Sequence, residues 1–138
     1  MTGSEPPEAA RFTRAPRAEH SATTNARANF LESVDAIEAF LGHAVSGGRE
    51  AFRRTSASYA SGSMAIIRAA ALFETDEFAP FVSDTPIEVV TALRTMRDIA
   101  SRTGSRAMND DLFWVTLTAE LPPHIADWRR AGVKAASD

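Results

Sequence analysis

Large apolar side chains recur every seven residues over the range 49–73, and small side chains stand between them. The large ones are Phe52, Tyr59, Ile66 and Phe73, and the small ones are Ser56, Ser63 and Ala70. Alternating spacings of four and three place all seven on one face of an α-helix. The neighbouring positions are mostly Ala, Ser and Gly, so another helix can approach closely. We therefore expect a central packing helix over 49–73, with its four large side chains as candidate interface residues.

The stretch before this helix predicts a second one. Asn29 is a good N-cap, and Glu32 stands three residues later, as in a capping box. Apolar side chains then repeat the four-three spacing at Phe30, Val34, Ile37, Leu41 and Ala44. Ser46, Gly47 and Gly48 favour a turn with a left-handed residue, which ends the helix. Two helices joined by so short a turn predict an N-terminal αα-hairpin.

Residues 74–84 interrupt the helical pattern with four acidic residues and one proline. Phe78 and Phe81 stand in this segment at a spacing of three. We expect an irregular turn whose two rings fold back onto the core, because large aromatic side chains are usually buried. The alternative is an exposed aromatic and acidic docking patch, so both rings are further candidate interface residues.

The remaining chain predicts further helical segments. Thr85 is the expected N-cap of a third helix that ends at Gly104. Asn109, followed by two aspartates, can start another segment. Its body, residues 110–121, alternates in part as a strand does, but we favour a helix because the chain offers no partner strand. The prolines at 122–123 are expected to end it and to begin a short last turn.

The length of 138 residues indicates one domain. Residues 1–27 contain three prolines and few large apolar side chains, which is typical of a disordered tail. Residues 28–132 form the expected domain, an all-α bundle of four to five helices. Residues 133–138 are expected to fray.

The composition argues against nucleic-acid binding, disulfides and metal binding. The net charge of −3 gives no general attraction to nucleic acid, and the absence of cysteine excludes disulfides and thiolate ligands. The three histidines are scattered, with no carboxylate or second histidine at ligand spacing. We therefore assign no catalytic, cofactor-binding or metal-binding residue.

No apolar run is long enough to span a bilayer and no secretory signal is present, so we expect a cytoplasmic protein. The dominance of Arg over Lys, together with abundant Ala, indicates a bacterial source.

Residues 96–106, MRDIASRTGSR, resemble the first half of the helix-turn-helix of bacterial regulators. Ile99 and Ala100 stand where that family has its packing pair, and Gly104 stands at its turn glycine. The resemblance implies a DNA-binding regulator. The chain departs from the family in the next segment, where carboxylates at 110–111 would face the phosphates.

The layout of the chain also resembles that of phasins, the helical proteins that coat polyester granules in bacteria. The shared features are amphipathic helices, a central helix rich in Ala and Ser, an acidic break and a further amphipathic helix. This resemblance implies a protein that binds a granule surface. The C-terminal part of the chain, with its tryptophans, departs from the phasin layout.

The long stripe of alternating large and small side chains offers more packing surface than one neighbouring helix needs. Together with the lack of a recognisable chemical motif, this favours a non-enzymatic protein–protein interaction module. The expected partner is a second copy of the chain, as in a homodimer, or another protein. Nucleic acid is not the expected partner, and helix-turn-helix and phasin-like functions are the alternatives.

Overall fold

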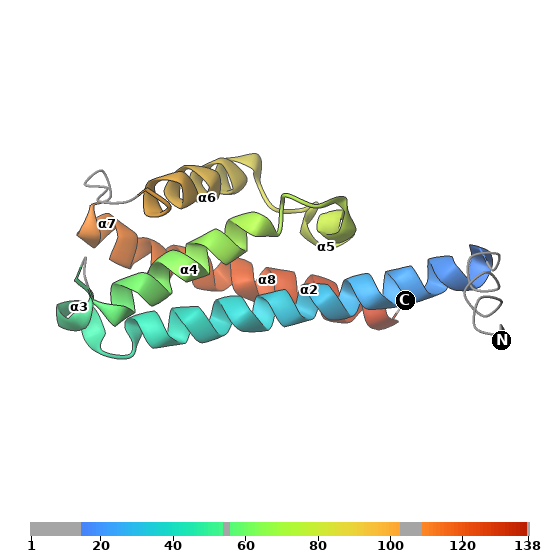
Figure 1. Cartoon of the computed structure of the whole chain (residues 1–138), viewed down its shortest axis with the longest axis horizontal. Coiled ribbons are helices and arrows are strands. Elements are labelled where there is room, and N and C mark those ends of the chain that lie inside the picture. Colours follow the sequence, from blue (N-terminus) through green and yellow to red (C-terminus); the bar gives the residue numbers. More distant parts are fainter. Residues whose placement is uncertain (1–14, 54–55, 103–108, 138) are drawn as a thin grey trace, which may run out of the picture.

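A computed structural model describes residues 15–53, 56–102 and 109–137, with side chains between residues 23 and 134. Every regular element in these ranges is helical, which confirms the predicted all-α bundle (Figure 1). The longer helices are α2 (Ala15–Val45), α4 (Ala57–Ala71), α6 (Ile87–Ala100) and α8 (Leu121–Ser137). The shorter ones are α3 (Gly48–Ala51), the 3-10 turn η1 (Asp76–Phe78), α5 (Ala79–Val82), α7 (Asp110–Val115) and the π-helix η2 (Thr116–Glu120).

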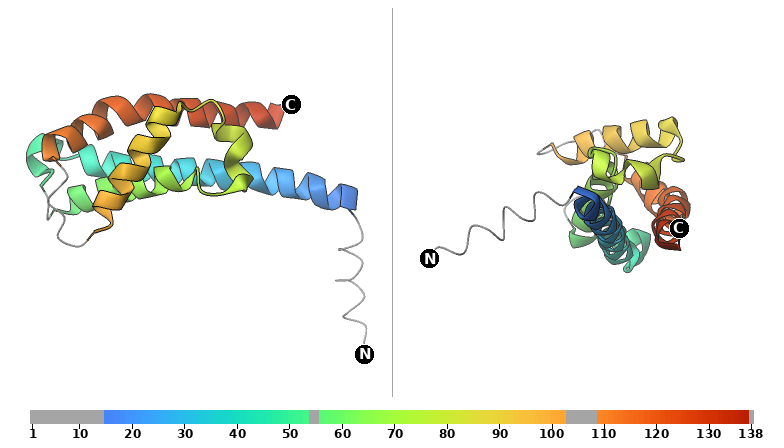
Figure 2. Two further views of the ribbon diagram at one scale, coloured as in Figure 1. Left: turned by 90° about the horizontal axis from the view of Figure 1, so that it is seen from above. Right: turned by 90° about the vertical axis from the view of Figure 1, so that its right-hand side faces the viewer.

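Helix α4 lies at the centre of the bundle. It packs antiparallel to α2 on one side and carries α6 on another (Figures 1 and 2). Helix α8 packs against α2 and α5. The predicted N-terminal hairpin is therefore present, and its turn lies where the sequence placed it. Gly48 has a φ of +79°, a left-handed conformation that glycine adopts without steric cost.

The single helix expected over 49–73 is wrong, because the chain leaves the helical conformation between α3 and α4. Ser56 is the N-cap of the new helix. Its hydroxyl accepts a hydrogen bond from the backbone N–H of Tyr59 at 3.0 Å and donates one to the carbonyl of Arg53 at 2.7 Å. A serine that bonds the local backbone in this way caps a new helix instead of continuing the old one. Phe52 consequently precedes α4, although its ring is still fully buried.

The helix start expected at Asn29 is also wrong, because α2 is already helical at Ala15. Residues 15–27 of the expected tail are therefore helical, whereas residues 1–14 lie outside the described residues. Alanine recurs through this stretch and has the highest helix propensity, and Pro16 fits the first turn. The side-chain amide of Asn29 does not cap a helix; it donates a hydrogen bond to Glu77 at 3.0 Å.

Phe78 and Phe81 fold back onto the core, as expected. The segment that carries them consists of η1 and α5, and Thr75 caps η1 by accepting the N–H of Glu77 at 3.2 Å. Both rings pack on Phe30 of α2, with centroid distances of 5.4 Å and 4.8 Å. This segment thereby closes one end of the apolar core over α2.

Residues 110–121 are helical, which confirms the prediction of a helix rather than a strand. The side-chain oxygen of Asn109 accepts the N–H of Leu112 at 3.0 Å, which confirms the predicted N-cap. The expected stop at 122–123 is wrong: both prolines lie in the first turn of α8, which continues directly from η2. The π-helix η2 forms just before them, with the N–H of Leu121 bonded to the carbonyl of Thr116.

Helix α8 is far longer than the short last turn that we expected. It continues to Ser137, and the fraying expected at 133–138 stays a prediction; residue 138 lies outside the described residues. The reason is tertiary packing. Ile125 and Trp128 are buried in the core, and Gly132 is buried against α2, so each turn of α8 up to that point is held by α2 or α5.

Helix α6 begins at Ile87 with Pro86 as its N-cap residue, one position later than expected. Thr85 does not cap it, since its hydroxyl accepts a hydrogen bond from Trp128. The helix ends at Ala100, and the expected stop at Gly104 lies outside the described residues. In the part of the chain that the structure describes, no helix has both the length and the apolar character needed to cross a bilayer.

Candidate functional site

The six candidate interface residues all lie against other parts of their own chain. Phe52 and Ile66 have no exposed surface, Phe78 and Phe81 are buried, and Tyr59 and Phe73 are half-buried. The structure brings Phe52 and Tyr59 together at one end of α4, with ring centroids 5.2 Å apart. It places Phe73 at the other end, 5.9 Å from Trp128. The stripe is therefore packed inside the bundle.

Phe113 of α7 completes the first of these clusters. Its ring lies 5.1 Å from both Phe52 and Tyr59, edge-on to each. Trp114 lies 5.3 Å from Phe52 on another side. This cluster fixes α7 to the start of α4, and so determines where the segment between α7 and α8 runs relative to α6.

An open apolar groove of about 460 Å³ lies between α6 and the continuous segment α7–η2–α8. We call it the α6 groove. From α6 it is lined by Glu88, Val89, Ala92, Leu93, Thr95 and Met96. From the opposite side it is lined by Leu112, Thr116, Glu120, Leu121 and His124. Among the described elements, α6 packs mainly on α4.

The floor of the α6 groove consists of buried side chains, and its one hydroxyl group is already hydrogen-bonded. Leu93 and Leu121 are buried beneath it, and Thr116 is buried beside them. The hydroxyl of Thr116 donates to the carbonyl of Leu112 at 3.0 Å, so it needs no outside partner. The walls are more open: 59 % of Leu112 is exposed, and Met96 is half-buried. Such a surface suits an apolar side chain.

The described residues that line the α6 groove carry negative charge. Glu88 and Glu120 are exposed, and none of the lining residues that the structure describes is Lys or Arg. The basic residues of α6 are engaged elsewhere. Arg94 and Arg97 pair with Glu74 at 2.8 Å and 3.5 Å. The hydrogen bond from Arg94 is the main reason that the pKa of Glu74 lies below its ordinary value.

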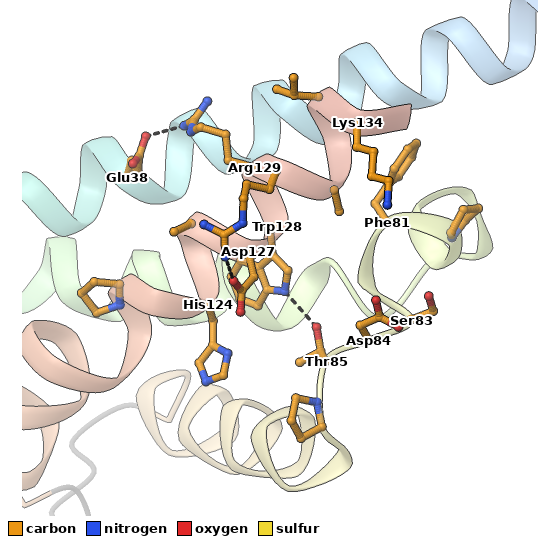
Figure 3. Close-up of a pocket in the computed structure, with 17 residues that line it drawn as sticks. Glu38, Phe81, Ser83, Asp84, Thr85, His124, Asp127, Trp128, Arg129 and Lys134 are labelled. Atoms are coloured by element: carbon orange, nitrogen blue, oxygen red, sulfur yellow. Dashed lines mark hydrogen bonds and ion pairs between the residues drawn. The ribbon is translucent and has the colours of Figure 1, made fainter. Parts of the chain in front are cut away.

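A second, more polar groove of about 1150 Å³ lies along the outer side of α8 and faces residues 80–86 (Figure 3). Many of its polar side chains bind one another. Arg129 pairs with Asp35 at 2.9 Å and also with Glu38, and Arg130 pairs with Asp127. Because these charges are mutually satisfied, this groove is a weaker candidate for a binding site.

Among the described residues, no group of three or more His, Cys, Asp or Glu side chains is placed so that it could hold a metal ion. His43 is exposed on the last turn of α2, and His124 lies on α8 between the two grooves. The side chain of His20 lies outside the described residues. That the chain has no catalytic or cofactor-binding residue stays a prediction.

The half match to a helix-turn-helix falls at the end of α6. Ile99 and Ala100 are half-buried on that helix, whereas Gly104 lies outside the described residues. The next helix, α7, has six residues and starts with Asp110 and Asp111. Asp111 pairs with Arg49 at 2.6 Å. The resemblance to DNA-binding regulators stays an untested prediction.

Comparison of the chain with protein-family models, with curated proteins and with solved structures finds no match. The candidate site therefore rests on geometry. Sequence reasoning missed the α6 groove, although Leu112 was a signal that could have drawn attention to it. Leu112 follows two aspartates on the first turn of a helix. Charged neighbours of this kind usually face solvent, so an apolar side chain beside them indicates an exposed apolar surface.

Proposed function

We propose that the chain is a non-enzymatic helical interaction module that binds a helix of another protein in the α6 groove. The observation that carries the proposal is the combination of a firm apolar floor, Leu93 and Leu121, with an open mouth between two helices. Helix-in-groove recognition uses this arrangement, with anchors spaced i, i+3 or i+4, and i+7.

The dimensions of the α6 groove support a short helical ligand. Its α6 wall extends from Glu88 to Met96, which corresponds to a rise of about 12 Å. A helix of about two turns, carrying two or three apolar anchors, covers that length. The exposed side chain of Leu112 would then be covered by the ligand.

Self-association, expected from the stripe of large and small side chains, remains part of the proposal. Phe52 and Ile66 have no surface left for a second copy, so contact would fall on the outer edges of Tyr59 and Phe73. Light scattering after size exclusion, over a concentration series, tests this. A constant monomer mass would remove self-association and leave the groove as the interaction site. The cytoplasmic location and the bacterial source stay predictions.

The absence of cysteine allows a direct test of the groove. Thr95 lines it and Thr91 does not, and both are exposed on α6. We would label Thr95→Cys and Thr91→Cys with an environment-sensitive fluorophore. Each would be titrated with a neutral amphipathic peptide of Leu and Gln. We expect a saturable change from the label at 95 and little from the label at 91. No response at 95 would overturn the proposed function.

A further inference from the structure

We infer that the α6 groove selects a basic amphipathic helix, one whose apolar anchors are flanked by Lys or Arg. The inference rests on the proposed function and adds the chemical class of the partner. It comes from the placement of charge around the groove, which is independent of the apolar floor that led to the groove itself.

Two carboxylates mark the edges of the site. Glu88 lies on the first turn of α6, and Glu120 closes η2 on the facing wall. Both are exposed, so a ligand on the floor between α6 and η2 would pass within reach of them. The described lining residues also include one histidine, His124.

The two arginines of α6 are held away from this rim. Arg94 and Arg97 form ion pairs with Glu74, between α4 and η1. Arg49 bonds Asp111 at 2.6 Å and also donates to the carbonyl of Phe52. Glu88 and Glu120 are the carboxylates among the described lining residues, and a ligand with positive charge at its flanks complements them.

The same charges argue against other occupants. A second copy that docked through its exposed Leu112 and Val115 would present them from a helix that begins with two aspartates. Acidic groups would then meet the rim formed by Glu88 and Glu120. The head group of a fatty acid or an anionic lipid would meet the same repulsion. A basic helix is the occupant that satisfies both the apolar floor and the acidic rim.

The effect of charge is expected to be moderate, because exposed ion pairs are screened by water and salt. Two such pairs correspond to about a fivefold gain in affinity at low ionic strength. A ligand with carboxylates in the same places would lose a similar factor. The affinity order Lys over Gln over Glu is therefore the signature to measure.

The experiment uses the whole chain labelled at Thr95→Cys, with three peptides that share one pattern of Leu anchors. Their polar positions are all Lys, all Gln or all Glu. The charge variant is Glu88→Lys with Glu120→Lys. Its matched control is Glu32→Lys with Glu50→Lys, two exposed glutamates away from the groove that change the net charge equally. Since Glu88 also favours the start of α6, Glu88→Gln with Glu120→Gln provides a milder second variant.

We expect the Lys peptide to bind the wild-type groove about fivefold more tightly than the Gln peptide at low salt. The Lys/Lys variant should invert the order of the Lys and Glu peptides, the Gln/Gln variant should abolish the preference, and the control should keep it. Equal binding of all three peptides would overturn the inference but leave the proposed function intact. A Lys preference that survives in both groove variants would also overturn it. Failure of every peptide to reach the label would overturn both.

Discussion

The indole N–H of Trp128 donates a hydrogen bond to the hydroxyl of Thr85 at 2.9 Å, which joins α8 to the segment that leads into α6 (Figure 3). Trp128 is almost fully buried, and its ring lies 5.9 Å from Phe73 at the end of α4. One side chain thus ties three helical segments together. Thr85 takes part in this contact and makes no side-chain cap bond to α6.

The first prediction concerns this hydrogen bond. Thr85→Val keeps the shape of the side chain but leaves the buried indole N–H of Trp128 without its acceptor, which costs about 1 to 3 kcal/mol of unfolding free energy. Trp128→Phe removes the donor but also removes volume, so its total cost is larger. Urea unfolding of both variants and of the double variant gives the coupling energy. We expect about 1 kcal/mol; a coupling near zero would show that the bond does not stabilise the fold.

The second prediction compares two helical glycines. A methyl group at Gly62 of α4 would lie 2.7 Å from Cδ1 of Leu117 and 3.1 Å from Cε1 of Phe52, both buried. A methyl group at Gly42 of α2 would meet nothing within 4 Å. Alanine gains about 1 kcal/mol over glycine in a helix interior, whereas overpacking costs about 1 to 3 kcal/mol. Gly42→Ala should therefore raise the unfolding free energy, and Gly62→Ala should lower it or leave it unchanged.

A matched background checks the cause. Leu117→Ala removes the atom nearest to the added methyl group, so Gly62→Ala should be better tolerated there than in the wild type. Thermal or urea unfolding of the four combinations gives this difference. If Gly62→Ala stabilises the wild-type chain as much as Gly42→Ala does, close packing of η2 against α4 is not the reason for glycine at 62.

The fold class followed from periodicity in the sequence. The stripe at Phe30, Val34 and Ile37 is buried as expected, and the turn at Gly48 lies where its glycines indicated. These features are local, because helix spacing and a left-handed turn are properties of neighbouring residues. The same holds for Asn109, whose cap was recognisable from its own segment.

Some of the errors arose where a contact distant in sequence overrode a local signal. Asn29 has the sequence of an N-cap but bonds Glu77, 48 residues away. The prolines at 122–123 have the sequence of a helix stop, but burial of Trp128 keeps α8 in place. The α6 groove could not be foreseen for the same reason. It depends on the angle between α6 and η2, and residue spacing within either segment does not contain that angle.

The third prediction concerns pH. The hydrogen bond from Arg94 lowers the pKa of Glu74, desolvation partly opposes it, and the charges of Arg94 and Arg97 add to the lowering. A carboxyl group with a lowered folded-state pKa contributes stability above its ordinary pKa, of about 4.3, and loses it as the pH falls toward the folded value. Unfolding free energy should therefore fall more steeply below about pH 5 in the wild type than in Glu74→Gln. Because Glu74 is exposed, the difference should be small and should shrink with added salt.

The control for this prediction is Glu32→Gln, which changes another exposed glutamate, on α2. This substitution leaves the ion pairs of Glu74 with Arg94 and Arg97 in place. Identical profiles for the wild type and Glu74→Gln, measured at low salt, would contradict a stabilising ion pair between Glu74 and α6.

The last prediction separates packing from self-association at Tyr59. Its ring lies about 5 Å from those of Phe52 and Phe113, so Tyr59→Arg would place a charge where two buried rings now make contact. We expect a loss of about 3 kcal/mol or more in unfolding free energy, since large aromatic truncations in cores cost that much and the charge adds a desolvation penalty. Urea unfolding and light scattering must be run on the same samples. If Tyr59→Arg retains wild-type stability and only the mass falls, Tyr59 belongs to an interface between copies; if stability falls and a monomeric mass is unchanged, its role is to hold α7 against α4.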